Sequence, residues 1–182
     1  HCHQAFPEIL ERYDAVLVMD DDIEIDAAGI EALFRLRERE GLLVVQPAFD
    51  PRGRVSHRVT LLNPLCEFRR TTFIEVTCPL FQTDVLVDFL RQYDGRLVGW
   101  GVDEWFSAEV LRRDGRGLGI VDAVPALNPH EKRKAGRVRE IDLLQRSRDR
   151  RLAWEAIAAE LGVASTSVKR TTERRWLPVR PA

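Results

Sequence analysis

The sequence predicts an α/β fold, in which a sheet is flanked by helices, and two observations support this class. Apolar runs of strand length alternate with segments whose apolar residues repeat at helical spacing. The first run, Tyr13–Met19, leads directly into three consecutive carboxylates, Asp20, Asp21 and Asp22. A buried strand that ends in charged residues delivers them to the rim of a sheet, where open α/β folds bind ligands. We therefore expect a ligand site at the end of this strand.

The acidic cluster itself has two interpretations. Adjacent ionised carboxylates repel one another unless a cation or hydrogen-bond donors compensate. Either the cluster holds a divalent metal, or it is a solvated turn before a helix that Asp26 caps. Its position directly after an apolar strand favours the metal.

The elements of the first half follow from apolar spacing and from turn residues. A short helix is expected over 4–12, before the first strand, and a longer one from Asp26 to a stop at Gly41. The apolar run 42–46 is then predicted as a parallel neighbour of the first strand, ended by Pro47.

The next elements are less regular. Turn chemistry at 50–53 predicts that 54–62 is an antiparallel excursion or a mobile loop. The β-branched, alternating stretch 70–78 predicts a strand, and 83–93 a helix capped by its first residue, Thr83. A further short strand is expected at 117–122.

A glycine-flanked tryptophan, Trp100, precedes a pair of acidic residues. Gly99 and Gly101 permit a tight backbone path, and the apolar spacing that follows places Asp103 and Glu104 in the first turn of a helix. This stretch is either a capped helix with a buried tryptophan or a carboxylate presented beside an aromatic platform, as in sites that handle sugars. Local sequence leaves both open.

The chain has 182 residues, enough for one core plus an appendage. We assign 1–136 to the core and 137–182 to a helical, basic C-terminal extension. Residues 130–182 carry a net charge of +7 and the preceding residues −8, which suggests a cation site in the body and an anionic partner for the tail. His130 lies between the two, in a polar loop; it is surface decoration unless the fold returns it to the acidic cluster, where imidazole and carboxylates would suit an ion such as Mn²⁺.

No apolar run reaches membrane-spanning length, so no membrane span is expected. The three cysteines lack CxxC spacing, which indicates neither a disulfide framework nor a zinc site and suits a reducing, cytoplasmic compartment.

The C-terminal stretch 152–175 offers a different function, because it resembles a helix-turn-helix. Ala158, Gly162 and Val168 fall where that motif needs a small residue, a turn glycine and a buried aliphatic residue. A second helix would then present Lys169, Arg170, Arg174 and Arg175 to DNA phosphates. DNA is therefore a possible partner.

Taken in order, the motifs resemble a glycosyltransferase of the GT-A fold and, more narrowly, the family catalogued as domain of unknown function 707. The resemblance covers about residues 5–135. Its motifs are Tyr13-Asp14, Met19-Asp20-Asp21-Asp22-Ile23, Gln46-Pro47-Ala48, Arg70–Val76, Pro79-Leu80-Phe81, Gly99–Asp103 and Gly119–Asp122.

The resemblance implies a partial GT-A sandwich with a mixed, mostly parallel sheet, lacking the N-terminal nucleotide-binding strands because only 19 residues precede Asp20. It also implies transfer of a sugar from a nucleoside-diphosphate donor to a hydroxyl acceptor. Asp20, Asp21 and Asp22 would bind the cofactor, Mn²⁺ or Mg²⁺.

Within that reading, Asp20 and Asp22 are metal ligands and His130 the third. Asp103 is the base that deprotonates the acceptor if the enzyme inverts configuration, with Glu104 as the alternative. Trp100 and Gly101 would bind the acceptor sugar.

Two further alternatives stay open. An apolar strand followed by Asp-x-Asp also opens the haloacid-dehalogenase phosphatases, with Asp20 as nucleophile and Asp22 as acid, although Ile23 and Glu24 fit that pattern poorly. The chain could also be a non-catalytic remnant of the GT-A fold.

Overall fold

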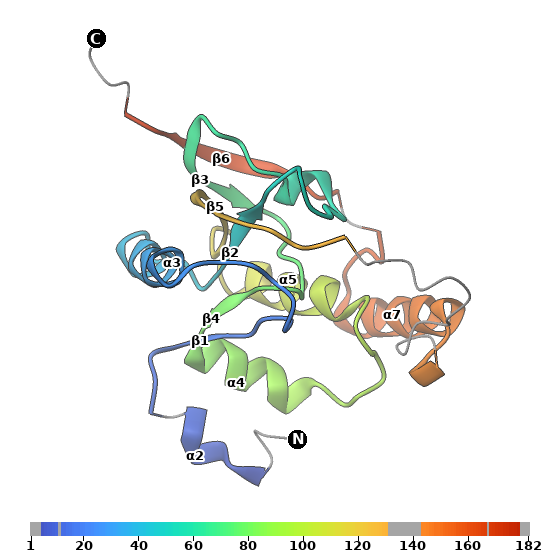
Figure 1. The fold of residues 1–182 in the computed structure, drawn as a ribbon. Helices are drawn as coiled ribbons and strands as arrows, with labels where there is room; N and C mark the ends of the chain where they lie inside the picture. The colour runs from blue at the N-terminus through green and yellow to red at the C-terminus, as the bar shows by residue number, and fades with distance from the viewer. Residues whose placement is uncertain (1–4, 11, 131–142, 167, 179–182) are drawn as a thin grey trace.

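The computed structural model describes residues 5–10, 12–130, 143–166 and 168–178, and has the expected α/β class (Figure 1). A six-stranded sheet has the order β1-β4-β2-β5-β3-β6. The strands are β1 (Ala15–Leu17), β2 (Val44–Phe49), β3 (Cys66–Thr71), β4 (Leu80–Gln82), β5 (Leu118–Ala126) and β6 (Thr171–Trp176).

The sheet is mostly antiparallel, so the prediction of a mostly parallel sheet is wrong. Among these strands only β2 and β5 pair in parallel; the other four pairings are antiparallel. The strand that sequence analysis placed next to β1 is β2, but β4 lies between them and pairs with both. Three residues, Leu80–Gln82, are too few to show the periodicity from which a strand can be recognised, yet they form the strand between β1 and β2.

Two predicted strand boundaries also differ from the structure. Strand β2 continues through Pro47 to Phe49, and its register with β5 shifts between Pro47 and Ala48. Proline has no N–H to donate, so such an irregularity in the ladder accommodates it. The strand predicted at 70–78 is instead β3 at Cys66–Thr71, so only its last two residues were expected. The Thr71 hydroxyl oxygen accepts a hydrogen bond from Phe73 N at 3.0 Å where the chain leaves the sheet.

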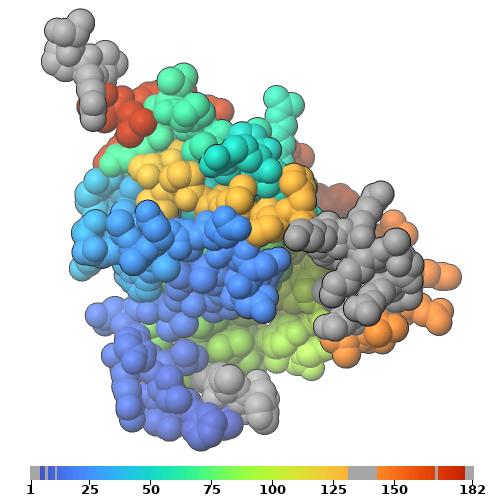
Figure 2. All heavy atoms as spheres, viewed as in Figure 1, coloured from blue at the N-terminus to red at the C-terminus, as the bar shows by residue number. Residues whose placement is uncertain are grey.

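Helices cover both faces of the sheet (Figure 1). Side chains of neighbouring strand residues point to opposite faces, so Val44 joins one core cluster and Val45 another. The helix on the Val45 face is α3 (Ala27–Arg39), and the opposite face carries α4 (Thr83–Gln92), α5 (Val102–Arg113) and α7 (Ser147–Leu161). Two further helical elements are α2 (Pro7–Leu10) and the 3₁₀ turn Arg58–Thr60. Figure 2 shows α3, in blue, beside the yellow-orange residues of β5.

Helix ends agree with the sequence at two places and differ at a third. Asp26 is the N-cap of α3, with its carboxylate accepting from Gly29 N at 2.6 Å, and Gly162 ends α7 in the left-handed conformation. Helix α4 is capped by Gln82 rather than by Thr83. The Thr83 hydroxyl instead donates to the carbonyl of Tyr13 and ties the helix to the strand before it.

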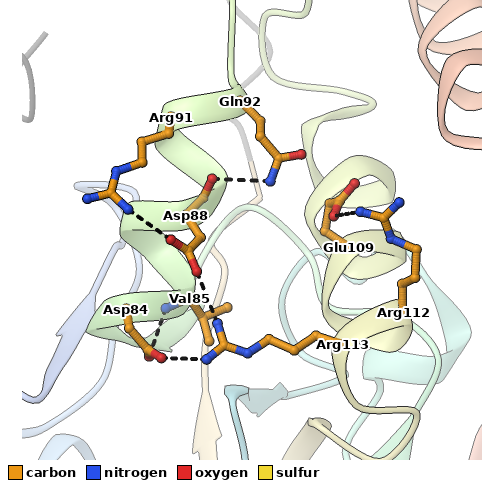
Figure 3. A network of polar contacts seen from close by, with 8 residues as sticks. All are labelled: Asp84, Val85, Asp88, Arg91, Gln92, Glu109, Arg112 and Arg113. Atoms are coloured by element: carbon orange, nitrogen blue, oxygen red, sulfur yellow. Dashed lines mark hydrogen bonds and ion pairs between the residues drawn. The ribbon is translucent and has the colours of Figure 1, made fainter.

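Helices α4 and α5 are joined by an ion-pair network on their exposed sides (Figure 3). Arg113, in the last turn of α5, contacts Asp84 at 2.5 Å and Asp88 at 3.3 Å, both on α4. These side chains are half-exposed, so the network orients the helices more than it stabilises them.

The C-terminal residues are built into the same core and sheet. From α7, Trp154, Ile157 and Ala158 are buried in the cluster that contains α5. Residues 171–176 form β6, which pairs antiparallel with β3, so the second helix of the predicted helix-turn-helix is wrong and the extension is not wholly helical. Two β-branched threonines open β6, and the exposed edge of β3 gives the segment a hydrogen-bonding partner. The first part of the extension predicted to be helical, up to residue 142, lies outside the described residues.

In the described part of the chain, no helix has the length and apolar character needed to cross a membrane.

Candidate active site

One cavity of about 840 Å³ collects most of the residues that the sequence singled out. It has the volume of a site for a small molecule or cofactor. Its walls come from several separate segments of the described chain: the acidic turn (Asp20 and Asp22), the loop around 54–57, the segment 75–77, the residues before and within the first turn of α5 (Gly99, Trp100 and Asp103), the residues after β5 (128–129) and the start of α7 (147–151).

The acidic turn forms one rim of the cavity. Asp20 N donates to Thr77 O at 2.9 Å, Ile23 N donates to Asp20 O at 3.3 Å, and the buried Ile23 anchors the turn. Burial raises the pKa of Asp20, and the charges of Asp22 and then Asp21 raise it further. A bound cation would relieve that repulsion, so Asp20 and Asp22 fit a hard divalent metal. Asp21 is exposed and does not line the cavity.

The segment that leads to His130 lies beside the acidic turn, but His130 itself does not line the cavity. Glu24 and Leu127 exchange two backbone hydrogen bonds of 2.9 Å, which holds the acidic turn beside the segment that leads to His130. Pro129 lines the cavity, whereas His130 is exposed. The described residues contain no group of three or more His, Cys, Asp or Glu side chains suited to a metal ion. The third ligand therefore stays a prediction.

The first turn of α5 delivers a buried carboxylate to the cavity. Gly101 is the N-cap with φ of 96°, a left-handed conformation that favours glycine. Asp103 is 5% exposed, and its Oδ1 accepts from Gly101 N at 3.1 Å and Glu104 N at 3.0 Å. Burial raises the pKa of Asp103 to about 6, although the charge of Lys169 opposes that rise. A carboxylate with such a pKa is suited to accept a proton near neutral pH.

The sequence left open whether Trp100 is buried or forms an exposed aromatic surface beside the carboxylate, and its exposed fraction decides between the two. Trp100 is 41% exposed and lines the same cavity as Asp103, whereas the buried tryptophan of α5 is Trp105. The arrangement is therefore a carboxylate and an aromatic surface facing one space. Gly101 packs against Leu97, and neither it nor Glu104 is a lining residue.

Three ionisable lining residues belong to a group of side chains that we call the inner cluster: His57, Glu75 and Asp103, together with Glu104 and Lys169, which do not line the cavity. Lys169 Nζ lies 2.6 Å from Glu104 Oε1 and 3.4 Å from His57 Nδ1. Burial, followed by the charge of Lys169, lowers the pKa of His57 to about 4, so its ring is neutral at pH 7. Burial raises the pKa of Glu75 to about 7. The inner cluster thus combines three carboxylates with one cation, the Lys169 ammonium, which is paired with Glu104.

Sequence reasoning did not assign His57 or Glu75 to any site, and it did not assign Lys169 to this one. Glu75 lay inside one of the family motifs, but nothing about its neighbours marked it as buried. Lys169 belonged to the stretch assigned to DNA phosphates; the return of the chain to β3 brings it 65 positions back to Glu104, and its ammonium also lies 3.9 Å from the centre of the Phe73 ring. Contacts at that separation leave no local pattern.

Arginines also line the cavity. Arg148, Arg150 and Arg151 come from the first turn of α7, and Arg54 comes from the loop after β2. Arg150 is buried and donates to Ser147 Oγ at 3.0 Å, while Arg148 and Arg151 are exposed. The cavity lining therefore combines carboxylates with guanidinium groups, which suits a ligand with phosphate groups and a metal ion.

The fold and the cavity together define an α/β protein with an acidic turn at the end of a strand and a buried carboxylate facing it. Residues 3–73 match the model of a family described as Protein of unknown function (DUF707). This confirms the family that the motifs indicated. The matched segment includes the acidic turn but ends before Trp100 and Asp103. No curated protein matches the sequence.

Proposed function

We propose that this chain carries the site of a metal-dependent glycosyltransferase, which moves a sugar from a nucleoside-diphosphate donor to a hydroxyl acceptor. The observation that carries the proposal is the single cavity shared by Asp20, Asp22, Trp100 and Asp103, which come from two separate segments of the chain. The resemblance of the chain's motifs to the GT-A fold supports the same proposal, because an acidic turn follows an apolar strand in this chain and in that fold.

Each side of the cavity has a part in this reaction. Asp20 and Asp22, with His130 as candidate third ligand, would hold Mn²⁺ or Mg²⁺, and the cation would stabilise charge on the departing diphosphate. The arginines of α7 add positive charge on the same ligand. Trp100 offers a flat apolar surface for a sugar ring. Asp103 then removes the proton from the acceptor hydroxyl, and its raised pKa suits that role in an inverting reaction.

The first test is binding. Isothermal titration calorimetry with Mn²⁺ and a nucleoside diphosphate should give a signal in the wild-type chain that is lost in Asp22→Ala. The matched control is Glu31→Gln, which alters an exposed carboxylate on α3 and should bind as the wild type does. Absence of binding by the wild-type chain would reject the proposal and leave the non-catalytic reading.

The second test separates binding from chemistry. Asp103→Asn keeps the size and the Oδ1 acceptor of the side chain but removes the base, so donor and metal binding should persist while sugar transfer falls by about 10²–10⁴-fold. Transfer would be followed by release of nucleoside diphosphate. Unchanged transfer in this variant would exclude Asp103 as the base, and turnover of a generic aryl phosphate instead would favour a phosphatase.

A further inference from the structure

The inner cluster holds more negative charge than its one lysine neutralises. Lys169 is paired with Glu104 at 2.6 Å, and His57 has a neutral ring at pH 7. Glu75 and Asp103 remain; they are 2% and 5% exposed and both line the cavity. Ionising both of two buried carboxylates that interact with each other costs free energy, because each charge is desolvated and the two repel. The pair therefore retains a proton.

Hydrogen-bond geometry indicates which of the two retains it. The Thr60 hydroxyl oxygen lies 2.5 Å from Glu75 Oε1 and 2.8 Å from the carbonyl oxygen of His57. A hydroxyl has one hydrogen, so it cannot donate to both oxygens at once. If Glu75 is protonated, Glu75 donates to Thr60, Thr60 donates to His57 O, and both short contacts are hydrogen bonds.

The surroundings of Asp103 favour the opposite state. Its Oδ1 accepts two backbone N–H groups in the first turn of α5, and such donors stabilise a carboxylate. The Glu75 carboxyl contacts the backbone of His57 and the Thr60 hydroxyl, and the single hydrogen of that hydroxyl is shared with the His57 carbonyl oxygen. The two acids are therefore set up for different protonation states.

We propose that Glu75 holds the exchangeable proton of the inner cluster at neutral pH and thereby leaves the neighbouring Asp103 ionised as the base. Glu75 is a positioning residue in this scheme, because it acts on the acceptor only through Asp103. When Asp103 takes the proton of the acceptor hydroxyl, Glu75 remains neutral, so the pair never carries two negative charges in the resting or the protonated state. The catalytic consequence rests on the function proposed above, whereas the protonation state does not.

The pKa values agree with this order of ionisation. With a pKa of about 6, Asp103 loses its proton while Glu75 is still neutral. Glu75, with a pKa of about 7, must then ionise against the charge of Asp103. Thr60, Lys169 and the backbone of His57 favour its charged form. Removing the Asp103 charge should therefore lower the pKa of Glu75. Removing the Glu75 carboxyl should leave the pKa of Asp103 nearly unchanged.

Carbon-13 NMR of side-chain carboxyls tests the inference without any substrate. The Glu75 signal is assigned by its loss in Glu75→Gln. In the wild-type chain the Glu75 signal should titrate near pH 7, and in Asp103→Asn it should titrate at lower pH. In Glu75→Gln the Asp103 signal should still titrate near pH 6. A Glu75 signal that titrates at the ordinary value of 4.5, or does not move in Asp103→Asn, overturns the proposal.

Thermal unfolding gives an independent readout. The unfolded chain loses the Glu75 proton near pH 4.5 and the folded chain only near pH 7, so this group destabilises the fold progressively as pH rises between those values. Glu75→Gln cannot ionise and keeps a donor for Thr60; its Tm relative to wild type should rise across this window and then level off. A pH-independent Tm difference overturns the proposal.

The catalytic part is tested by the pH dependence of transfer. The wild type should show two ionisations, near 6 and 7, and Glu75→Gln one, near 6. An unaltered two-step profile in Glu75→Gln rejects the tuning role. If no transfer is found with any donor while the NMR titrations behave as expected, the protonation state of Glu75 is supported and the glycosyltransferase proposal fails.

Discussion

Replacing Arg69 by Met should be among the most destabilising single changes in this protein. Arg69, on β3, forms a bidentate ion pair with Asp122 on β5, through Nε at 2.8 Å and Nη2 at 2.9 Å. Its guanidinium also donates to the carbonyl oxygens of Val59 and Leu61 at 2.9 and 2.8 Å. The side chains of Arg69 and Asp122 are 7% and 0% exposed, so no solvent replaces these contacts.

The magnitude follows from that burial. Removing one partner of a buried pair leaves an uncompensated charge and costs about 3–5 kcal/mol, a large share of the roughly 5–15 kcal/mol that stabilises a typical domain. At about 2–4 °C per kcal/mol for a chain of this size, Tm should fall by roughly 10 °C. The double variant Arg69→Met/Asp122→Leu removes both charges and should lose less than the sum of the two single variants.

Urea denaturation and thermal melts of the four proteins in this cycle give the coupling energy. Arg35→Met is the control, because its pair with Glu31 on α3 is exposed on both sides and should contribute about 0.5 kcal/mol or less. A loss below about 1 kcal/mol for Arg69→Met, or strictly additive single changes, would refute the argument that burial makes this pair costly to break.

Two further changes test other parts of the fold by the same melts. Asp26→Ala removes the acceptor of Gly29 N and should cost about 1 kcal/mol, while Asp26→Asn should recover most of it; equal losses in both would exclude the cap as the cause. Trp154→Ala empties a buried position of α7 and breaks the Nε1 hydrogen bond to Ser165 O of 2.7 Å, so it should cost about 3–5 kcal/mol. A negligible loss would show that α7 is not part of the cooperative core.

Local chemistry made several features accessible from sequence. Asp26 caps its helix because a short acidic side chain before an amphipathic run reaches the free N–H groups of the first turn. Asp103 and Glu104 lie in the first turn of α5 because the preceding glycines interrupt any earlier helix. The acidic turn follows an apolar strand in the sequence and in the structure alike. Each of these depends on residues within four or five positions.

Pairing between distant segments did not have such a signature. The three residues of β4 pair with β1 and β2, which makes the sheet mostly antiparallel. Residues 171–176 become a strand because β3 offers them an edge, although 163–175 has the residues of a turn and a second helix. Hydrogen bonds to a neighbouring strand override weak local preference, and that neighbour is fixed only once the chain has folded.

The sequence alone determined the α/β class, the helix starts and stops at Asp26 and Gly162, and the candidate residues Asp20, Asp22, Trp100 and Asp103. Tertiary structure alone decided that these four face one cavity and that arginines of α7 join them there. It also decided that the three carboxylates of the inner cluster are buried with one lysine among them. The physical reason is that residue type and spacing record local backbone preferences. Burial and charge balance, by contrast, depend on which distant segments come to lie against each other.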